Sequence, residues 1–227
     1  MSDPNETYGG PEFIKPVKPR PGLFKTGGIV TRCMEPGLDK ATLTSQVRTY
    51  HQRSYLTPFG TDETDARGAY LYAIDQVLVA KVLATLNFAG LDLKDRDADG
   101  FPGLGQMASL CLKSFSLNDH FPNRDYPDDP NAYFKQFGDN PAAWVILDWE
   151  RGVGGWSLHA RWTIDEATGR RRVYCKLWNV QNGFTPRFEA LKDGESSDAP
   201  DIMPHGEFVI PLDRLLPVIL KDREAMN

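Results

Sequence analysis

The sequence predicts an α+β fold in which about three helices pack on one face of a C-terminal antiparallel sheet. This prediction rests on the hydrophobic period, which is helical in the first half of the chain and changes to two in the second half. The stretch Trp156–Asp165 alternates apolar and polar residues, as expected for a strand with one buried face and one open face. With 41% hydrophobic and 25% charged residues among 227, the chain also has enough apolar material for a sizeable core.

The first 30 residues predict an extended arm, because they are rich in Pro and Gly and hold few large apolar side chains. The segment "KPVKPRPG" favours polyproline II geometry, which would let the arm pack along its own domain or enter an aromatic groove. We expect residues 31–227 to form a single globular α+β domain.

The most apolar stretch predicts a core helix that begins near Thr61 or Asp62 and ends at Asn87 or Phe88. Charged residues in its middle, Asp75 and Lys81, argue against a membrane span. A second helix is expected over 103–115, and a third over 128–138, where an Asp-Pro pair marks a helix start.

Three strands are predicted in the second half, over 144–150, 156–165 and 171–180, with a Gly-containing hairpin turn between the last two. A further strand is expected over 206–211. A short helical tail follows it, broken or restarted at Pro217.

An acidic loop, "DRDADG", places Asp95, Asp97 and Asp99 at the first, third and fifth positions and Gly100 at the sixth. This spacing resembles EF-hand-like loops and the loops of extracellular calcium repeats, which implies calcium as a ligand. The twelfth position is Gln106, so the bidentate Glu of such loops is missing. The sequence therefore leaves open a weak calcium site or an acidic turn that leads into a helix.

A candidate catalytic set lies on the predicted sheet. If the strands over 144–150 and 156–165 pair, Asp148 and Glu150 can share a face with His159 and Arg161. Carboxylates beside a His and an Arg suit acid–base hydrolysis of a glycosidic or acyl bond. The alternative is an exposed sheet face with weak ion pairs across the strands.

A second arrangement resembles papain-like enzymes, in which Gln, Cys, His and Asn occur in this order. Here the order is Gln106, Cys111, His159 and Asn179, which implies a Cys nucleophile. Cys111 falls well inside its predicted helix, a position that favours core packing. The three cysteines show no zinc or disulfide spacing.

We therefore expect a soluble, non-enzymatic binding or interaction protein with another protein or a small ligand as partner. The alternatives are the two hydrolases above. The net charge of −5 argues against nucleic acid, and calcium is the only cofactor that the sequence suggests. The first residues do not resemble a signal peptide, which predicts a cytoplasmic protein or one exported by another route.

Overall fold

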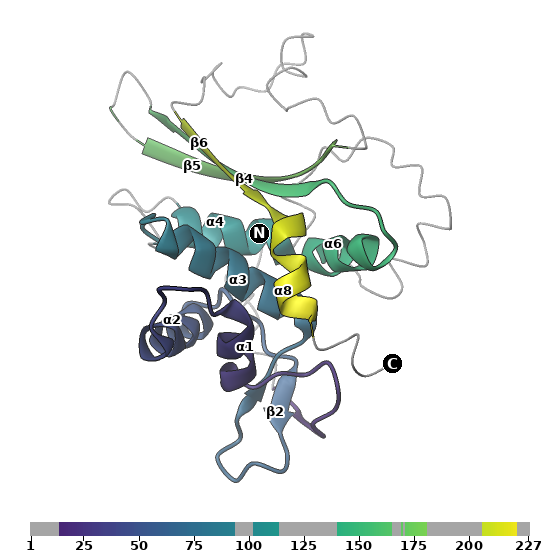
Figure 1. The fold of residues 1–227 in the computed structure, drawn as a ribbon. Coiled ribbons are helices and arrows are strands. Elements are labelled where there is room, and N and C mark those ends of the chain that lie inside the picture. Colours follow the sequence, from purple (N-terminus) through teal and green to yellow (C-terminus); the bar gives the residue numbers. More distant parts are fainter. Residues whose placement is uncertain are drawn as a thin grey trace, which may run out of the picture.

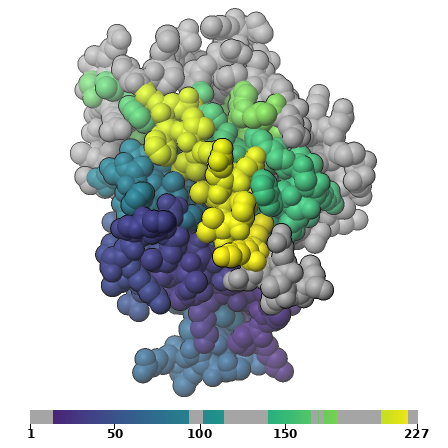
Figure 2. Space-filling model, in the orientation of Figure 1, coloured from purple at the N-terminus to yellow at the C-terminus, as the bar shows by residue number. Residues whose placement is uncertain are grey.

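The computed structural model describes residues 14–93, 102–113, 140–164, 169, 171–180 and 206–221. It confirms the α+β fold (Figure 1). A three-stranded sheet forms the upper layer, helices lie beneath it, and a small β-hairpin projects at the opposite end from that sheet. Figure 2 shows the hairpin as a narrow extension of the body.

The N-terminal elements are β1 (Pro16–Val17), α1 (Thr26–Cys33), α2 (Lys40–Gln52), β2 (Gly60–Asp62) and β3 (Tyr70–Leu71). β1 pairs in parallel with β2, which pairs antiparallel with β3. The approach of β1 explains Gly60, since a Cβ at that position would clash with a methyl group of Val17. Part of the predicted arm is therefore the edge strand of this sheet, and α1 begins inside the predicted arm.

The hairpin corrects one prediction, because no helix begins at Thr61 or Asp62. The Asp62 carboxylate accepts hydrogen bonds from the Thr64 backbone N–H at 2.8 Å and from its hydroxyl at 2.6 Å. These bonds close a turn instead of capping a helix, which is the other common role of Asp. Gly68, at φ +61°, then reverses the chain into β3.

The core helix α3 (Ile74–Phe88) starts after the hairpin and ends as predicted. It is buried on nearly every side, including Lys81, which is 1% exposed. The Lys81 Nζ donates to Glu35 Oε1 at 2.5 Å and to the Cys33 carbonyl at 3.1 Å, so the buried charge is paired and hydrogen-bonded. The second predicted helix is also confirmed, as α4 (Leu104–Lys113). The third lies outside the described residues.

The predicted strand over 144–150 is wrong, because this segment belongs to helix α6 (Pro141–Glu150). The Asn140 side chain caps the helix by accepting from the Ala143 N–H at 3.2 Å, and Pro141 occupies the first turn. Apolar side chains that surround a short helix mimic a buried strand, since a period cannot be read when both faces are apolar.

The C-terminal sheet confirms the remaining strands, as β4 (Trp156–Ile164), β5 (Arg171–Asn179) and β6 (Gly206–Pro211). The strand order is β5-β4-β6 and both pairings are antiparallel. The inner face rests on α4 and supplies the buried residues Trp156, Leu158, Ala160, Cys175 and Leu177.

The chain then passes through the short 3-10 helix η4 (Leu212–Arg214) into α8 (Leu216–Leu220). Pro217 lies in the first turn of α8, so the predicted restart of the helical tail is confirmed. α8 contacts both α1 and α3. Figure 2 shows this yellow segment running from the sheet to the purple and blue N-terminal elements. In the described part of the chain, no helix is long and apolar enough to cross a membrane.

Candidate functional site

His159 and Arg161, two of the predicted catalytic residues, lie together on the outer face of β4. Both contact Glu207 on the neighbouring strand β6. The Glu207 Oε1 atom lies 2.6 Å from His159 Nδ1 and accepts from Arg161 Nε at 2.5 Å. Burial opposes the ionisation of Glu207, but the bonds from Arg161 and His159 outweigh it and lower the Glu207 pKa below its ordinary value.

Asp148 and Glu150 do not join this cluster, because both lie on α6. The Asp148 carboxylate is buried and accepts from the indole N–H of Trp156 at 2.9 Å. Trp156 points to the inner face of β4, whereas His159 points to the outer face. The predicted four-residue set is therefore not assembled, and Glu207 takes the place of its carboxylates.

The outer face also carries Ser157, whose hydroxyl lies 2.9 Å from His159 Nε2. Ser157, His159 and Glu207 thus form a continuous row of hydrogen bonds. Trp178 lies beside the row, with its ring centroid 6.0 Å from that of His159, and Lys176 Nζ lies 5.6 Å from the Trp178 centroid.

The papain-like set is not brought together either. Cys111 lies on α4 beneath the sheet, and Asn179 lies on β5 opposite the inward-facing Trp156. Both are fully buried, on the side opposite the outward-facing His159. Gln106 is on α4, close to the start of that helix. All three cysteines are buried thiols. Burial raises the pKa of Cys33 to about 12 and raises the pKa of Cys175, so neither is an activated thiol.

The predicted calcium ligands Asp95, Asp97 and Asp99 lie outside the described residues. Within the ranges that the structure describes, no cluster of His, Cys, Asp or Glu has the geometry of a metal site.

A second candidate site, which was not predicted from the sequence, is the helix pair α1 and α2. Six residues separate these helices, including Gly37 at φ +88°, and the helices pack on each other (Figure 1). The Asp39 carboxylate caps α2 by accepting from the Thr42 N–H at 2.7 Å. The bond from Lys81 to Glu35 fixes the connection between the helices to α3. The two helices therefore form a helix-turn-helix in the general sense of two packed helices joined by a short connection, and this connection, at six residues, is longer than the three or four residues typical of the DNA-binding motif.

The second helix of this unit, α2, has a buried face and a polar exposed face. Leu43, Val47 and Tyr50 pack into the core. Five of its six exposed residues carry hydrogen-bonding side chains, and the sixth is Ala41. The five are Lys40, Thr42, Ser45, Arg48 and Gln52.

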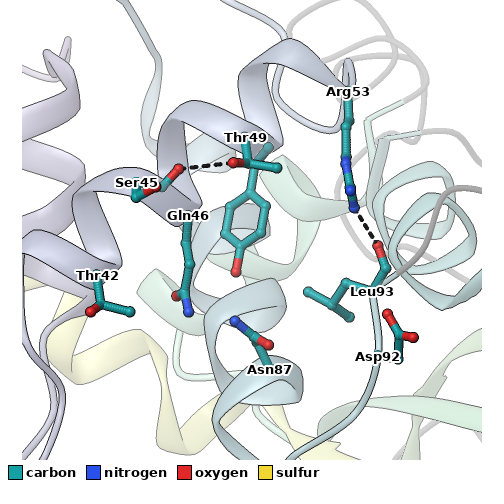
Figure 3. Close-up of a pocket in the computed structure, with 9 residues that line it drawn as sticks. Thr42, Ser45, Gln46, Thr49, Arg53, Asn87, Asp92 and Leu93 are labelled. Carbon is teal, nitrogen blue, oxygen red and sulfur yellow. Dashed lines mark hydrogen bonds between the residues drawn. The ribbon is translucent and has the colours of Figure 1, made fainter.

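A polar pocket of about 390 Å³ lies between α2 and the segment that follows α3 (Figure 3). Gln46 and Thr49 reach it from α2, and Asn87 reaches it from α3. Arg53 closes one side by donating to the Leu93 carbonyl at 2.9 Å. The Gln46 Oε1 atom is buried and has no hydrogen-bond partner among the described residues, so an acceptor is available to a donor that enters the pocket.

The hairpin β2–β3 stands next to this helix pair. Lys25, which immediately precedes α1, holds the hairpin by ion pairs to Asp62 at 2.7 Å and Asp65 at 3.0 Å. From α2, the His51 ring packs on Tyr70 with 4.3 Å between the centroids. Arg67 is exposed near the hairpin tip. The hairpin is therefore a wing attached to the helix-turn-helix, and we call residues 14–72 the head.

The head is basic although the whole chain is acidic. Residues 14–72 contain nine Lys and Arg against five Asp and Glu. Four of these acids have structural partners, since Asp39 caps α2, Asp62 and Asp65 pair with Lys25, and Glu35 pairs with Lys81. This local imbalance is visible in the sequence and is hidden by the net charge of the whole chain.

No family model matches the chain, and comparisons with curated proteins and with solved structures found no significant similarity.

Proposed function

We propose that the protein is a binding protein whose partner is double-stranded DNA, held by the head. The observation that carries the proposal is the order of elements: a helix-turn-helix with a polar, exposed second helix, followed directly by a hairpin wing. In helix-turn-helix proteins, the second helix enters the major groove while the first crosses the backbone.

The exposed face of α2 has the chemistry for base contacts. Its 13 residues span about 20 Å, and the helix is thin enough for a major groove about 12 Å wide. Arg48 can pair with guanine and Gln52 with adenine, while Thr42 and Ser45 can contact several bases. Because α2 is capped and one of its faces is buried, its backbone is already ordered before binding, which lowers the entropic cost of binding.

The exposed cations of the head suit the phosphate backbone. Lys15, Lys18 and Arg20 lie on or beside β1, which pairs with the wing, and Arg67 lies near the wing tip. Arg20 is placed by a cation–π contact, 5.4 Å from the centroid of the Phe59 ring. Because such contacts act locally, the negative net charge of the whole chain does not prevent them.

Selection of binding sequences from a randomised duplex library tests the proposal. We expect enrichment of a defined sequence, and we expect Arg48→Ala to relax the preference at particular base pairs while retaining the fold. Arg214→Ala, on η4, is the matched control, since it removes the same charge far along the chain. Failure to enrich any sequence, with no binding to random duplex at low salt, would refute the proposal.

A hydrolase is the second candidate function, and the hydrogen-bonded row of Ser157, His159 and Glu207 favours it. In an acyl transfer, the Ser157 Oγ would attack an ester carbonyl carbon while His159 Nε2 accepts the hydroxyl proton. His159 would return this proton to the leaving alkoxide, and water would then cleave the acyl-serine. Glu207 would hold the imidazole in position, with Arg161 fixing the carboxylate.

Hydrolysis of p-nitrophenyl acetate tests this candidate. Activity that Ser157→Ala and His159→Ala abolish, and that Ser45→Ala leaves unchanged, would support it. Equal rates for all variants would eliminate it, and the row would then be a structural network of the sheet surface.

For the acidic loop we propose a weak calcium site at Asp95, Asp97 and Asp99. Calorimetric titration compares the protein with an Asp97→Ala/Asp99→Ala variant. We expect heat at millimolar calcium only for the unchanged chain. No heat from the unchanged chain would end the proposal.

A further inference from the structure

A second pocket, of about 450 Å³, lies at the base of the wing. Pro58 and Phe59, just before β2, form its apolar side, and Phe59 is 49% exposed. Asp75 from α3 and Lys113 from α4 bring opposite charges to its lining. Its volume is in the range of small-ligand sites.

Asp75 provides a buried carboxylate. The residue is only 9% exposed, and its Oδ2 atom accepts from Gln76 Nε2 at 2.7 Å and from Asn140 Nδ2 at 2.8 Å. Both donors are neutral amides, and no cation pairs with Asp75 in the part of the chain that the structure describes. A buried carboxylate without a cation is costly, and an ammonium group would relieve that cost.

Lys113 provides the complementary charge. Its Nζ donates to the Ser54 carbonyl at 2.8 Å and to the Thr57 hydroxyl at 3.3 Å, both uncharged oxygens. Burial lowers the pKa of Lys113, and no carboxylate pairs with it among the described residues. An anion in the pocket would therefore stabilise its charged form.

Asp75 and Lys113 thus line one cavity without forming an ion pair with each other. We propose that this pocket binds a small zwitterion with an apolar side chain, of the amino-acid class, whose ammonium contacts Asp75 and whose carboxylate contacts Lys113. The apolar part would cover Pro58 and Phe59. Two opposite charges in one cavity select a ligand that carries both, because a ligand with one charge leaves the other unpaired.

The position of the pocket connects it to the wing. The Phe59 N–H donates to the Leu71 carbonyl at 2.7 Å, which closes the base of the hairpin, and the Thr57 N–H donates to the Gln76 side chain at 2.8 Å. Lys113, on α4, and Asn140, the N-cap of α6, both lie outside the head. A bound ligand would therefore join the wing to the rest of the protein. Binding itself does not depend on the DNA proposal, whereas an effect on DNA affinity would.

Calorimetry on the full chain tests the proposal with L-phenylalanine and L-leucine as probes. We expect binding by at least one probe, and at least tenfold weaker binding by N-acetyl-L-phenylalanine, which lacks the ammonium, and by phenethylamine, which lacks the carboxylate. Asp75→Asn and Lys113→Met should each weaken binding of the amino acid at least tenfold. Glu63→Gln and Lys221→Met, at exposed positions that line neither pocket, are the controls that remove one charge of each sign.

The absence of heat from both amino acids at about 10 mM would overturn the proposal, as would equal binding by the single-charge analogues. Unchanged affinity in Lys113→Met would overturn it even if Asp75→Asn failed to fold, because the loss of Lys113 leaves the amide contacts of Asp75 intact. DNA affinity measured with and without the amino acid is a separate readout, so failure of DNA binding is distinguishable from failure of ligand binding.

Discussion

Removal of two cations from α2 should change the salt dependence of DNA binding by an amount that the structure bounds. Lys25 and Arg53 are held by contacts within the chain, to Asp62 and to the Leu93 carbonyl. Six further exposed Lys and Arg of the head can face phosphates: Lys15, Lys18, Arg20, Lys40, Arg48 and Arg67. The logarithm of the binding constant falls linearly with the logarithm of the salt concentration, and each phosphate contact steepens the slope by about 0.9. Six contacts therefore give a slope of magnitude about 5 at most. Between about 50 and 200 mM salt, affinity would then fall by up to about a thousandfold.

In the variant Lys40→Ala/Arg48→Ala, the magnitude of the slope should be smaller by about 1.8, because two of these contacts are lost. Over the same fourfold range of salt, the factor by which affinity falls should therefore be about twelve times smaller for the variant than for the unchanged protein. The assay is fluorescence anisotropy of a labelled duplex over a series of salt concentrations. The control Arg214→Ala/Lys221→Ala removes the same net charge outside the head. If both double variants reduce the slope equally, the DNA does not bind at α2 and the assignment of the head is refuted.

Three further outcomes are expected. Glu35→Gln should destabilise the fold by about 3 kcal/mol, because it leaves the buried ammonium of Lys81 without its carboxylate. Lys81→Met should cost less, because the carboxylate that it leaves unpaired is one-third exposed to water. The free energies of unfolding in urea rank the two variants. The bonds from Lys25 and then Thr64 lower the pKa of Asp62 to about 2, so this carboxylate stabilises the fold above about pH 4 and loses that effect as the pH falls towards 2. Acid titration of Lys25→Met should therefore show a weaker pH dependence of stability, and an unchanged curve would contradict this pairing. The three cysteines are buried, so iodoacetamide should label them only after unfolding, and rapid labelling of the folded chain would contradict the packing.

The sheet could be predicted from the sequence because its pattern is produced by burial on one side only. Trp156, Leu158 and Ala160 alternate with Ser157 and His159, and the structure places the first set inward and the second outward. Strict alternation of this kind is typical of a half-buried strand. The same reasoning fails for α6, whose apolar residues leave no period to detect. There β-propensity favours a strand, although an N-cap Asn and a Pro indicate a helix.

The head could not be predicted by the same signals. Helix α1 contains Gly27 and Gly28, and α2 contains three Thr, all of which are weak helix formers. The helices exist because Ile29 and Val30 of α1 and Leu43 and Val47 of α2 are buried in the core, which is a tertiary effect. Two Thr hydroxyls in α2 also donate to carbonyls one turn earlier.

Of the four residues that the sequence suggests as a catalytic set, only two lie together in the structure. His159 and Arg161 share a face as expected, but their carboxylate partner, Glu207, comes from a strand that follows much later in the chain. Alternation within a strand predicts the face of a side chain, whereas the neighbour across the sheet depends on strand order. No local pattern in the sequence specifies that order.

The contact of α8 with α1 has a consequence for biosynthesis. A nascent chain that has emerged only as far as α3 lacks α8, the helix that packs on α1 and α3. After β4 has emerged, this strand still lacks its neighbour β6. Until residues 206–220 leave the ribosome, an apolar patch and an open strand edge are both available to other chains. A fragment designed to isolate residues 14–93 would inherit the same exposed patch, so it should be produced with α8 supplied as a fused or separate peptide.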